Sequence, residues 1–207
     1  MFNTIMSDRT ESKRNLIMDA AIRIFAQRGY YKSRIHDIAK EADVAYGLFY
    51  HYFPSKEDIL INIYQNAWNN LLGYIDHINR KTDEPFDRLR SVIRYIFRSF
   101  HRNPQLLKVL IMDVPRVDKF YNDENQHIFN LFFTRIAEII EAGQKRGLIR
   151  KSHAPLIAAF IIHGSVDSII RQYVYDPDFN LIEFSAMEIT DQIAGVVFQG
   201  LRSDSKH

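Results

Sequence analysis

Apolar residues recur at helical spacing along almost the whole chain, and this periodicity is the feature that most limits its fold. Near the N-terminus, for example, Ile17, Ala20, Ala21, Ile24 and Phe25 stand at positions i, i+3, i+4, i+7 and i+8, which lie on one face of a helix. Alternating apolar and polar runs of useful length are missing, as are the Asn-Gly and Asp-Gly pairs typical of hairpins. The sequence therefore predicts an all-α fold.

Residues that begin and end helices divide this pattern into nine predicted helices. Gly29 ends the first helix, Ser33 caps a short second one, Pro54 stops a short third one and Ser55 caps a long fourth one. The fourth helix, near residues 56–79, is expected to bridge a small N-terminal bundle and the rest of the chain. The other five helices are predicted near residues 85–103, 105–114, 122–146, 155–175 and 181–201, with a turn at residues 176–178 before the last.

The composition excludes several classes of protein. Of the 207 residues, 46% are hydrophobic and 25% are charged, as in globular domains. There is no uncharged apolar run of about 18 residues and no signal-peptide core in the first ten residues, so we expect a cytoplasmic protein that does not bind membranes. Cysteine is absent, and the eight histidines show no His-x-x-x-His pair. We therefore expect no metal site and no cofactor.

The charge of the chain is unevenly distributed. The formal net charge is only +2, but the stretch from Arg9 to Lys40 contains eight basic and three acidic residues. A local excess of positive charge favours binding of a polyanion such as nucleic acid.

The segment from Ser33 to Leu60 reads SRIHDIAKEADVAYGLFYHYFPSKEDIL and predicts two short helices joined by a tight turn. It resembles the DNA-binding domain of the tetracycline-repressor (TetR) family. The matching positions are Ile38, Ala39, Ala42, Val44, Gly47, the run from Tyr50 to Phe53, Lys56 and Leu60. The resemblance implies a nine-helix TetR-like fold, with a helix-turn-helix DNA-binding domain at residues 10–70 and a ligand-binding and dimerisation domain at residues 71–207.

In a helix-turn-helix motif the second helix enters the major groove, keeping an apolar face on its bundle and presenting small or polar residues to the bases. Phosphates are expected to bind at helix N-termini. The residues predicted to contact double-stranded DNA are Ser33, Arg34, Ala45, Tyr46, Gly47, Leu48, Tyr50, His51 and Lys56. Leu48 is also a candidate, with Phe49 and Phe53, for the face that packs on the bundle.

Two positions depart from the family pattern. Asp43 stands where the family usually has glycine, although aspartate tolerates the left-handed conformation better than most residues. Ala45 stands where the family has serine or threonine, so the recognition helix is expected to lack its usual N-cap.

The resemblance also implies a homodimer formed by the last two helices of each subunit, whose two-fold symmetry matches a palindromic operator. Apolar residues of these two helices, and the glycines Gly164, Gly195 and Gly200, fit a close helical interface.

The stretch from His163 to Leu181 is similar to TetR-family regulators of fatty-acid metabolism, which respond to long-chain acyl-CoA. A surplus of aromatic residues in the central helices could line an apolar cavity, and basic side chains could bind an anionic head group. The predicted ligand-binding residues are Phe97, Phe100, His101, Phe129, Phe132, Phe133 and Arg171, and Arg98 and Arg102 are further candidates for the head group. The alternative is that these phenylalanines only fill the core.

Two other classes of function fit the sequence less well. An enzyme is disfavoured because the chain lacks nucleotide-binding, nucleophile-elbow and zinc-protease motifs. A helical adaptor without DNA binding would leave the Ser33 to Leu60 pattern unexplained. We expect a repressor whose effector shifts the spacing of two N-terminal bundles through the fourth helix.

Overall fold

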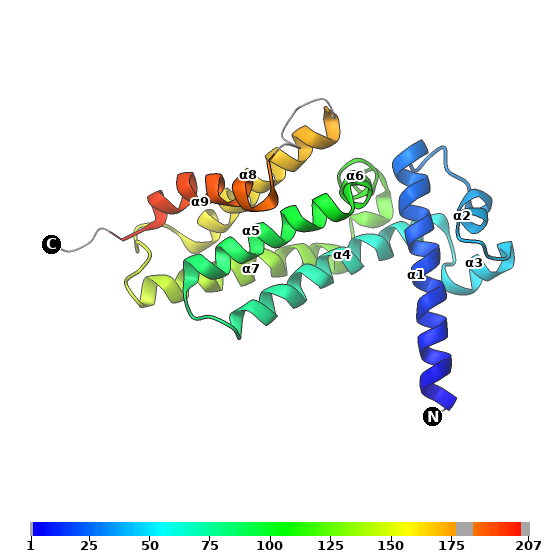
Figure 1. The fold of residues 1–207 in the computed structure, drawn as a ribbon, viewed down its shortest axis with the longest axis horizontal. Coiled ribbons are helices and arrows are strands. Elements are labelled where there is room, and N and C mark those ends of the chain that lie inside the picture. The colour runs from blue at the N-terminus through cyan, green and yellow to red at the C-terminus, as the bar shows by residue number, and fades with distance from the viewer. Residues whose placement is uncertain (1, 177–183, 204–207) are drawn as a thin grey trace. The chain divides into compact units, whose positions relative to one another are not determined.

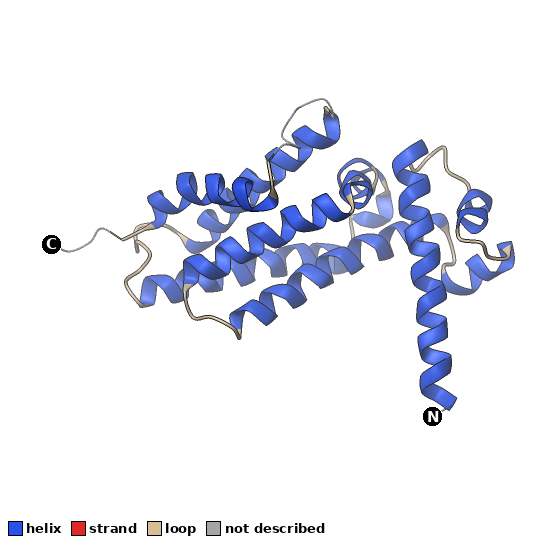
Figure 2. Cartoon of the chain, viewed as in Figure 1, coloured by secondary structure: helices blue, strands red, loops and turns tan. Residues whose placement is uncertain are grey.

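The computed structural model describes the backbone of residues 2–176 and 184–203, and the side chains from residue 13 onward. Within these residues the chain forms nine α-helices and two short 3₁₀ helices and contains no strand (Figures 1 and 2). The predicted all-α class is confirmed. The elements are α1 (Phe2–Arg28), α2 (Ile35–Glu41), α3 (Tyr46–Tyr52), α4 (Lys56–Asn79), α5 (Pro85–Arg102), α6 (Pro104–Met112), η1 (Val114–Arg116), η2 (Asp118–Phe120), α7 (Asp123–Lys145), α8 (Pro155–Tyr175) and α9 (Ala186–Leu201).

The chain divides into two compact units. The first comprises residues 1–66 and 105–122, and the second comprises residues 67–104 and 123–207. The first division lies within α4, near the expected domain boundary at residue 70, and residues 105–122 group with residues 1–66. Their contacts with that unit are long-range in sequence, and helical periodicity carries no signal for such contacts. The two-domain division itself stays a prediction.

In the first unit, α2 and α3 lie on one side of α1 (Figure 1). The face of α1 predicted from the periodicity is buried: Ile17, Ala20, Ala21 and Phe25 have no exposed surface and Ile24 has 4%. Gly29 ends the helix with a φ of +76°, a conformation that glycine adopts without steric cost. This short bundle holds α3 on the surface of the unit.

In the second unit, α7 packs along α8, and α5 packs against both α9 and α7. The buried residues Leu89, Ile93 and Phe97 of α5 and Ile136 and Ile140 of α7 form much of its core. No helix in the described ranges is both long enough and apolar enough to span a membrane.

Two predicted helix starts are wrong. Arg34, not Ser33, is the N-cap of α2, and no side chain caps that helix. Helix α9 begins at Ala186 rather than near residue 181, because Ser185 and Glu188 form a reciprocal capping box there. Residues 181–183 of the predicted helix, and most of the predicted turn at 176–178, lie outside the described residues.

Candidate nucleic-acid interface and ligand-binding interior

The turn between α2 and α3 is tight and has a left-handed residue at its centre. Asp43 has a φ of +52°, the only positive φ of a non-glycine residue in the described part of the chain. The N–H of Val44 donates to the carbonyl of Ala39 at 3.0 Å and closes the turn. Ala45 follows as the N-cap of α3 without a side-chain hydrogen bond, as predicted. Asp43 thus adopts the left-handed conformation, which aspartate tolerates better than most residues.

Helix α3 has one buried and one exposed face. Phe49 and Phe53 are almost wholly buried, and their rings lie 5.9 Å apart. The exposed residues are Ala45, Tyr46, Gly47, Tyr50 and His51, and Leu48 is half-exposed. The structure therefore brings six of the nine predicted DNA-contacting residues together on or beside one short helix; their contacts with DNA remain a prediction.

Tyr46 and Tyr50 form a pair on the exposed face of α3. Their hydroxyl oxygens are 3.1 Å apart, and their rings meet edge to face with centroids 5.4 Å apart. The hydrogen bond to Tyr46 raises the pKa of Tyr50 above its ordinary value. The pair offers a fixed arrangement of hydrogen-bonding groups to a partner.

Ser33 is placed differently from the prediction. It is 3% exposed, and its hydroxyl donates to the carbonyl of Gly29 at 2.8 Å. Its backbone N–H donates to the carbonyl of Tyr30. Because both donors are used inside the bundle, Ser33 is not available to a phosphate, whereas the neighbouring Arg34 is exposed.

Lys56 also has a structural role that the sequence did not indicate. Its ammonium donates to the carbonyls of Tyr30 at 2.8 Å and Ser33 at 2.9 Å. Partial burial lowers the pKa of this ammonium, and the nearby charge of Glu57 acts in the opposite direction. Lys56 therefore stabilises the segment between α1 and α2, and a phosphate would compete with these two carbonyls for it.

Part of the N-terminal positive charge is neutralised within the first unit. Arg23 pairs with Glu41 at 2.6 Å and Arg28 pairs with Asp37 at 3.0 Å. Lys32, Arg34 and Lys40 are exposed around α2. These three exposed side chains are candidate cations for phosphate contacts.

Residues 105–122 are tied to the N-terminal bundle by polar contacts. The buried carboxylate of Asp113 accepts the N–H of Tyr30 at 3.1 Å, and the hydroxyl of Tyr31 donates to the carbonyl of Arg116 at 2.7 Å. Burial raises the pKa of Asp113, while the Tyr30 N–H, Arg116 and Lys108 act in the opposite direction. These contacts explain why this segment belongs to the first unit.

The interior of the second unit contains an aromatic cluster around His163 of α8. Its ring lies 5.1 Å from Phe133, 5.6 Å from Phe132 and 6.0 Å from Phe129, and 6.5 Å from Trp68 of α4. Burial lowers the pKa of His163; Asp167 acts to raise it and Arg171 to lower it further. Three of the predicted ligand-binding residues thus meet here, together with Trp68 and His163, which were not predicted.

The other predicted ligand-binding residues lie elsewhere. Phe97 is fully buried in α5, and Phe100 packs on Tyr173 of α8 with ring centroids 5.0 Å apart. His101 is exposed and hydrogen-bonds through Nδ1 to the carbonyl of Phe97. Arg171 pairs with Asp167 at 2.6 Å, so its charge already has a partner. Neither basic residue therefore offers a free, enclosed cation for an anionic group.

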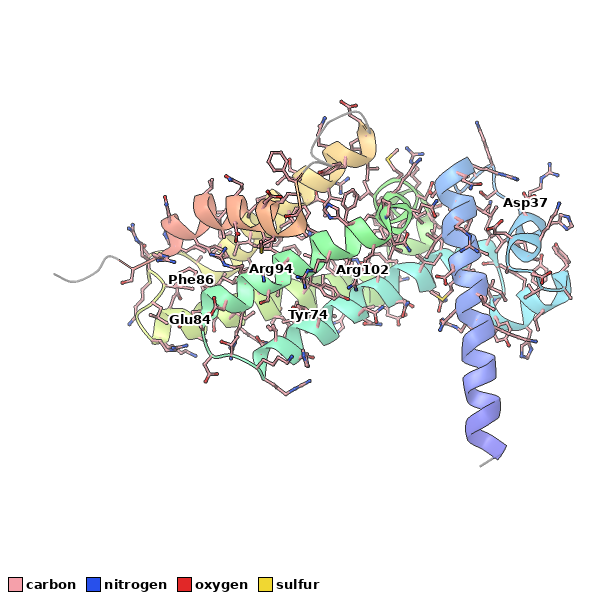
Figure 3. The ribbon with its side chains drawn as sticks, in the orientation of Figure 1. Asp37, Tyr74, Glu84, Phe86, Arg94 and Arg102 are labelled. Atoms are coloured by element: carbon pink, nitrogen blue, oxygen red, sulfur yellow. The ribbon has the colours of Figure 1, made fainter. Side chains whose placement is uncertain are left out.

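Two donors in the second unit were missed by the sequence analysis. The Nε of Arg94 and the hydroxyl of Tyr173 are buried and have no hydrogen-bond partner within the described residues. Arg94 lies in the middle of α5 (Figure 3). Buried polar groups are nearly always satisfied, so both are candidates for contacts with a ligand. Arg94 stands between the apolar residues Ile93 and Tyr95 in the sequence, and no motif distinguished it from the exposed Arg98 and Arg102.

Helices α8 and α9 carry exposed apolar side chains. Ile157 and Ile161 of α8 are 58% and 57% exposed, and Val196 of α9 is 79% exposed. A Cβ added at Gly164, Gly195 or Gly200 would meet nothing within 4 Å in this chain. Ile162 and Ile193, in contrast, are buried in the core of the unit. The exposed set is a candidate interface with a second subunit.

Within the described residues there is no group of three histidine, aspartate or glutamate side chains able to hold a metal ion. The candidate sites are the exposed face of α3 in the first unit and the aromatic cluster around His163 in the second.

Comparison with known proteins agrees with this arrangement. Residues 17–63 match the family described as bacterial regulatory proteins, tetR family, and residues 64–195 match the family described as YsiA-like protein, C-terminal region. The fatty acid metabolism regulator protein of Bacillus subtilis is 24% identical over 181 residues, which cover 87% of this chain and 93% of that protein. The transcriptional repressor KstR of Mycolicibacterium smegmatis is 26% identical over 138 residues, which cover 67% of this chain and 68% of that protein. These relatives are regulators and not enzymes.

Solved structures show the same fold. The fatty acid degradation regulator FadR from Bacillus halodurans superposes with a TM-score of 0.82 at 21% identity, covering 92% of this chain and 97% of that chain. FadR from Bacillus subtilis in complex with stearoyl-CoA has a TM-score of 0.77 at 23% identity, covering 89% of this chain and 97% of that chain.

Proposed function

The chain belongs to the tetR family of bacterial regulatory proteins, and on that basis we propose that it is a repressor released from its operator by an amphipathic effector. The observation that carries the DNA-binding part is the surface of α3. Phe49 is buried while Tyr46, Gly47, Tyr50 and His51 are exposed on one short helix after a tight turn. This is the arrangement that a recognition helix requires in the major groove.

We propose long-chain acyl-CoA as the effector. The relative from Bacillus subtilis is named a fatty acid metabolism regulator, and FadR from that organism binds stearoyl-CoA. In this chain, support comes from the cluster of Trp68, Phe129, Phe132, Phe133 and His163, whose ring faces suit an apolar chain. The half-buried Arg94, whose Nε has no partner within the described residues, would supply a cation for the anionic or carbonyl end of such a ligand.

The path of the chain supports coupling between effector and DNA. The backbone passes from one unit to the other within α4 after Asn66, between Pro104 and Gln105, and between Asn122 and Asp123. The segment 105–122 is fastened to the first unit through Tyr30 and Asp113. A change in the second unit would thus reach the first unit through α4 and through this segment, shifting the population of the DNA-binding arrangement.

We also propose that the active form is a cytoplasmic homodimer built from α8 and α9. The exposed Ile157, Ile161 and Val196 would be buried against a second copy. Two copies would place two α3 helices on a palindromic operator.

The decisive experiment is a fluorescence-anisotropy titration against duplex from the upstream region of the protein's own gene, at fixed near-physiological salt, with and without stearoyl-CoA. Free coenzyme A and a random duplex are the controls. Tight, sequence-selective binding that stearoyl-CoA weakens is expected. Equal binding to random duplex would contradict the proposed DNA recognition, and an unchanged affinity with saturating stearoyl-CoA would contradict the proposed effector.

A further inference from the structure

The exposed face of α3 lacks the side chains that most often read bases. Helix α3 has the sequence YGLFYHY and contains no arginine, lysine, asparagine, glutamine or carboxylate. Arginine and lysine commonly bind guanine through two hydrogen bonds, and asparagine and glutamine bind adenine in the same way. Base recognition by this helix must therefore use hydroxyl, imidazole or apolar groups.

The paired tyrosines supply two of these groups in a fixed geometry. Tyr46 and Tyr50 are one helical turn apart and are 50% and 45% exposed. Their hydroxyl oxygens are 3.1 Å apart, and either can be the donor of the bond between them. A hydroxyl has one donor and two acceptor positions. One O–H is consumed within the pair, so one hydroxyl keeps its donor and the oxygen of the other stays available as an acceptor, whichever way the bond runs.

We propose that the Tyr46–Tyr50 hydroxyl pair reads the adenine of an A·T base pair in the major groove. Adenine presents an acceptor, N7, beside a donor, the N6 amino group, whereas guanine presents two acceptors and cytosine one donor. A donor beside an acceptor complements adenine as the amide of asparagine does, and it leaves one guanine acceptor unmatched. The inference rests on the proposed DNA-binding function and names the base pair that this surface selects.

The surroundings of the pair fit the same base pair. The exposed methyl group of Ala45 stands next to Tyr46 at the start of α3, and the edge-to-face rings add further apolar surface. Apolar groups contact the C5 methyl group of thymine, which is the other member of an A·T pair. The pair of tyrosines and Ala45 together therefore match both bases.

The first test is selection of binding sites from a library of random duplexes, with the wild type, Tyr46→Phe and Tyr52→Phe. Tyr52→Phe is the matched control because it removes one hydroxyl from a half-buried tyrosine of the same helix. We expect the wild type and Tyr52→Phe to select a half-site with a fixed A·T position, and Tyr46→Phe to lose the preference at that position alone. An unchanged preference in Tyr46→Phe would overturn the inference.

The second test removes the adenine groups one at a time from the selected duplex. Replacing adenine by 7-deazaadenine removes the N7 acceptor, and replacing it by 2-aminopurine removes the N6 amino group. A base contact through two hydrogen bonds changes affinity roughly five- to 150-fold. Each single change should therefore weaken DNA binding of the wild type by a part of that factor. It should have little effect on Tyr46→Phe, and equal losses in both proteins would overturn the inference. A wild type that selects no sequence at all would instead contradict the proposed function.

Discussion

The ammonium of Lys56 donates a hydrogen bond to the carbonyl of Tyr30 at 2.8 Å and lies 4.3 Å from the centre of the Tyr30 ring. One side chain thus joins the start of α4 to the segment that follows α1. The family resemblance alone would assign this lysine to a phosphate, but its geometry within the bundle gives it a structural role as well.

Replacing Lys56 with methionine should destabilise the protein. The substitution keeps the aliphatic chain but leaves the carbonyls of Tyr30 and Ser33 without their charged donor, so we expect a loss of about 1–2 kcal/mol in the free energy of unfolding. Urea unfolding measures it, and Lys40→Met, at an exposed position of α2, is the control. Unchanged stability with weakened DNA binding would show that Lys56 serves the phosphate alone.

Gly47→Ala should change stability and DNA binding in opposite directions. A Cβ at Gly47 would meet nothing within 4 Å in the chain, and alanine favours a helix over glycine by up to about 1 kcal/mol. If the backbone of α3 approaches DNA closely, the same methyl group should weaken operator binding at least severalfold. Thermal unfolding and anisotropy measure the two effects. Gly73→Ala in α4, where a Cβ also meets nothing, should raise stability without affecting DNA, and equal operator affinity in both variants would count against a close approach.

Arg94→Met should impair the response to effector and spare the fold. The Nε of Arg94 has no partner among the described residues, so removing it breaks no hydrogen bond of that atom with them. Hydrogen bonds to charged groups are worth about 1.5–3 kcal/mol, so the stearoyl-CoA concentration that releases DNA should rise by roughly ten- to 150-fold. Arg80→Met and Lys145→Met, at exposed positions of the same unit, are the controls. Arg94 has no role in effector binding if its variant responds as they do.

His163 should make stability depend on pH. Burial lowers its pKa below the ordinary value of 6.5, so the unfolded chain binds more protons than the folded one between the two values. Stability contributed by the neutral imidazole is therefore present above about pH 6.5 and is lost as the pH falls below it, by at most about 1.4 kcal/mol per pH unit.

The measurement is urea unfolding of the wild type and His163→Phe from pH 5 to 8. The difference between them should grow in favour of the variant as the pH falls, while His127→Gln, at an exposed position, should follow the wild type. A difference that stays constant with pH would rule out this titration.

Val196→Glu should break the proposed dimer. A charge on a side chain that is 79% exposed costs little in a single subunit but a great deal in a buried apolar interface. Sedimentation should show a monomer that has lost tight binding to a palindromic duplex. Asn130→Glu, at an exposed position of α7, should remain dimeric, and a dimeric Val196→Glu would place the interface elsewhere.

Local sequence determined the elements that depend on neighbours along the chain. The buried face of α1 follows from the spacing of Ile17, Ala20 and Phe25, and the end of that helix follows from Gly29. The turn at Asp43 and the start of α3 at Ala45 without a side-chain cap were also predictable from the local sequence. These features depend on backbone conformation and periodicity, which a few adjacent residues set.

Contacts between distant residues were decided by the tertiary structure. Ser33 and Lys56 both fitted a phosphate-binding pattern, yet Ser33 is enclosed with its donors used, and Lys56 binds two carbonyls more than twenty residues away. Asp113 links residues 105–122 to the first unit, because its carboxylate accepts a hydrogen bond from the N–H of Tyr30. Nothing in the local sequence distinguished Arg94 from the other arginines of α5, but its Nε is buried without a partner among the described residues. The polar partners and the exposure of a side chain depend on which segments fold around it. Hydrophobic periodicity predicts which face of a helix is buried, but it does not predict which segment packs against that face.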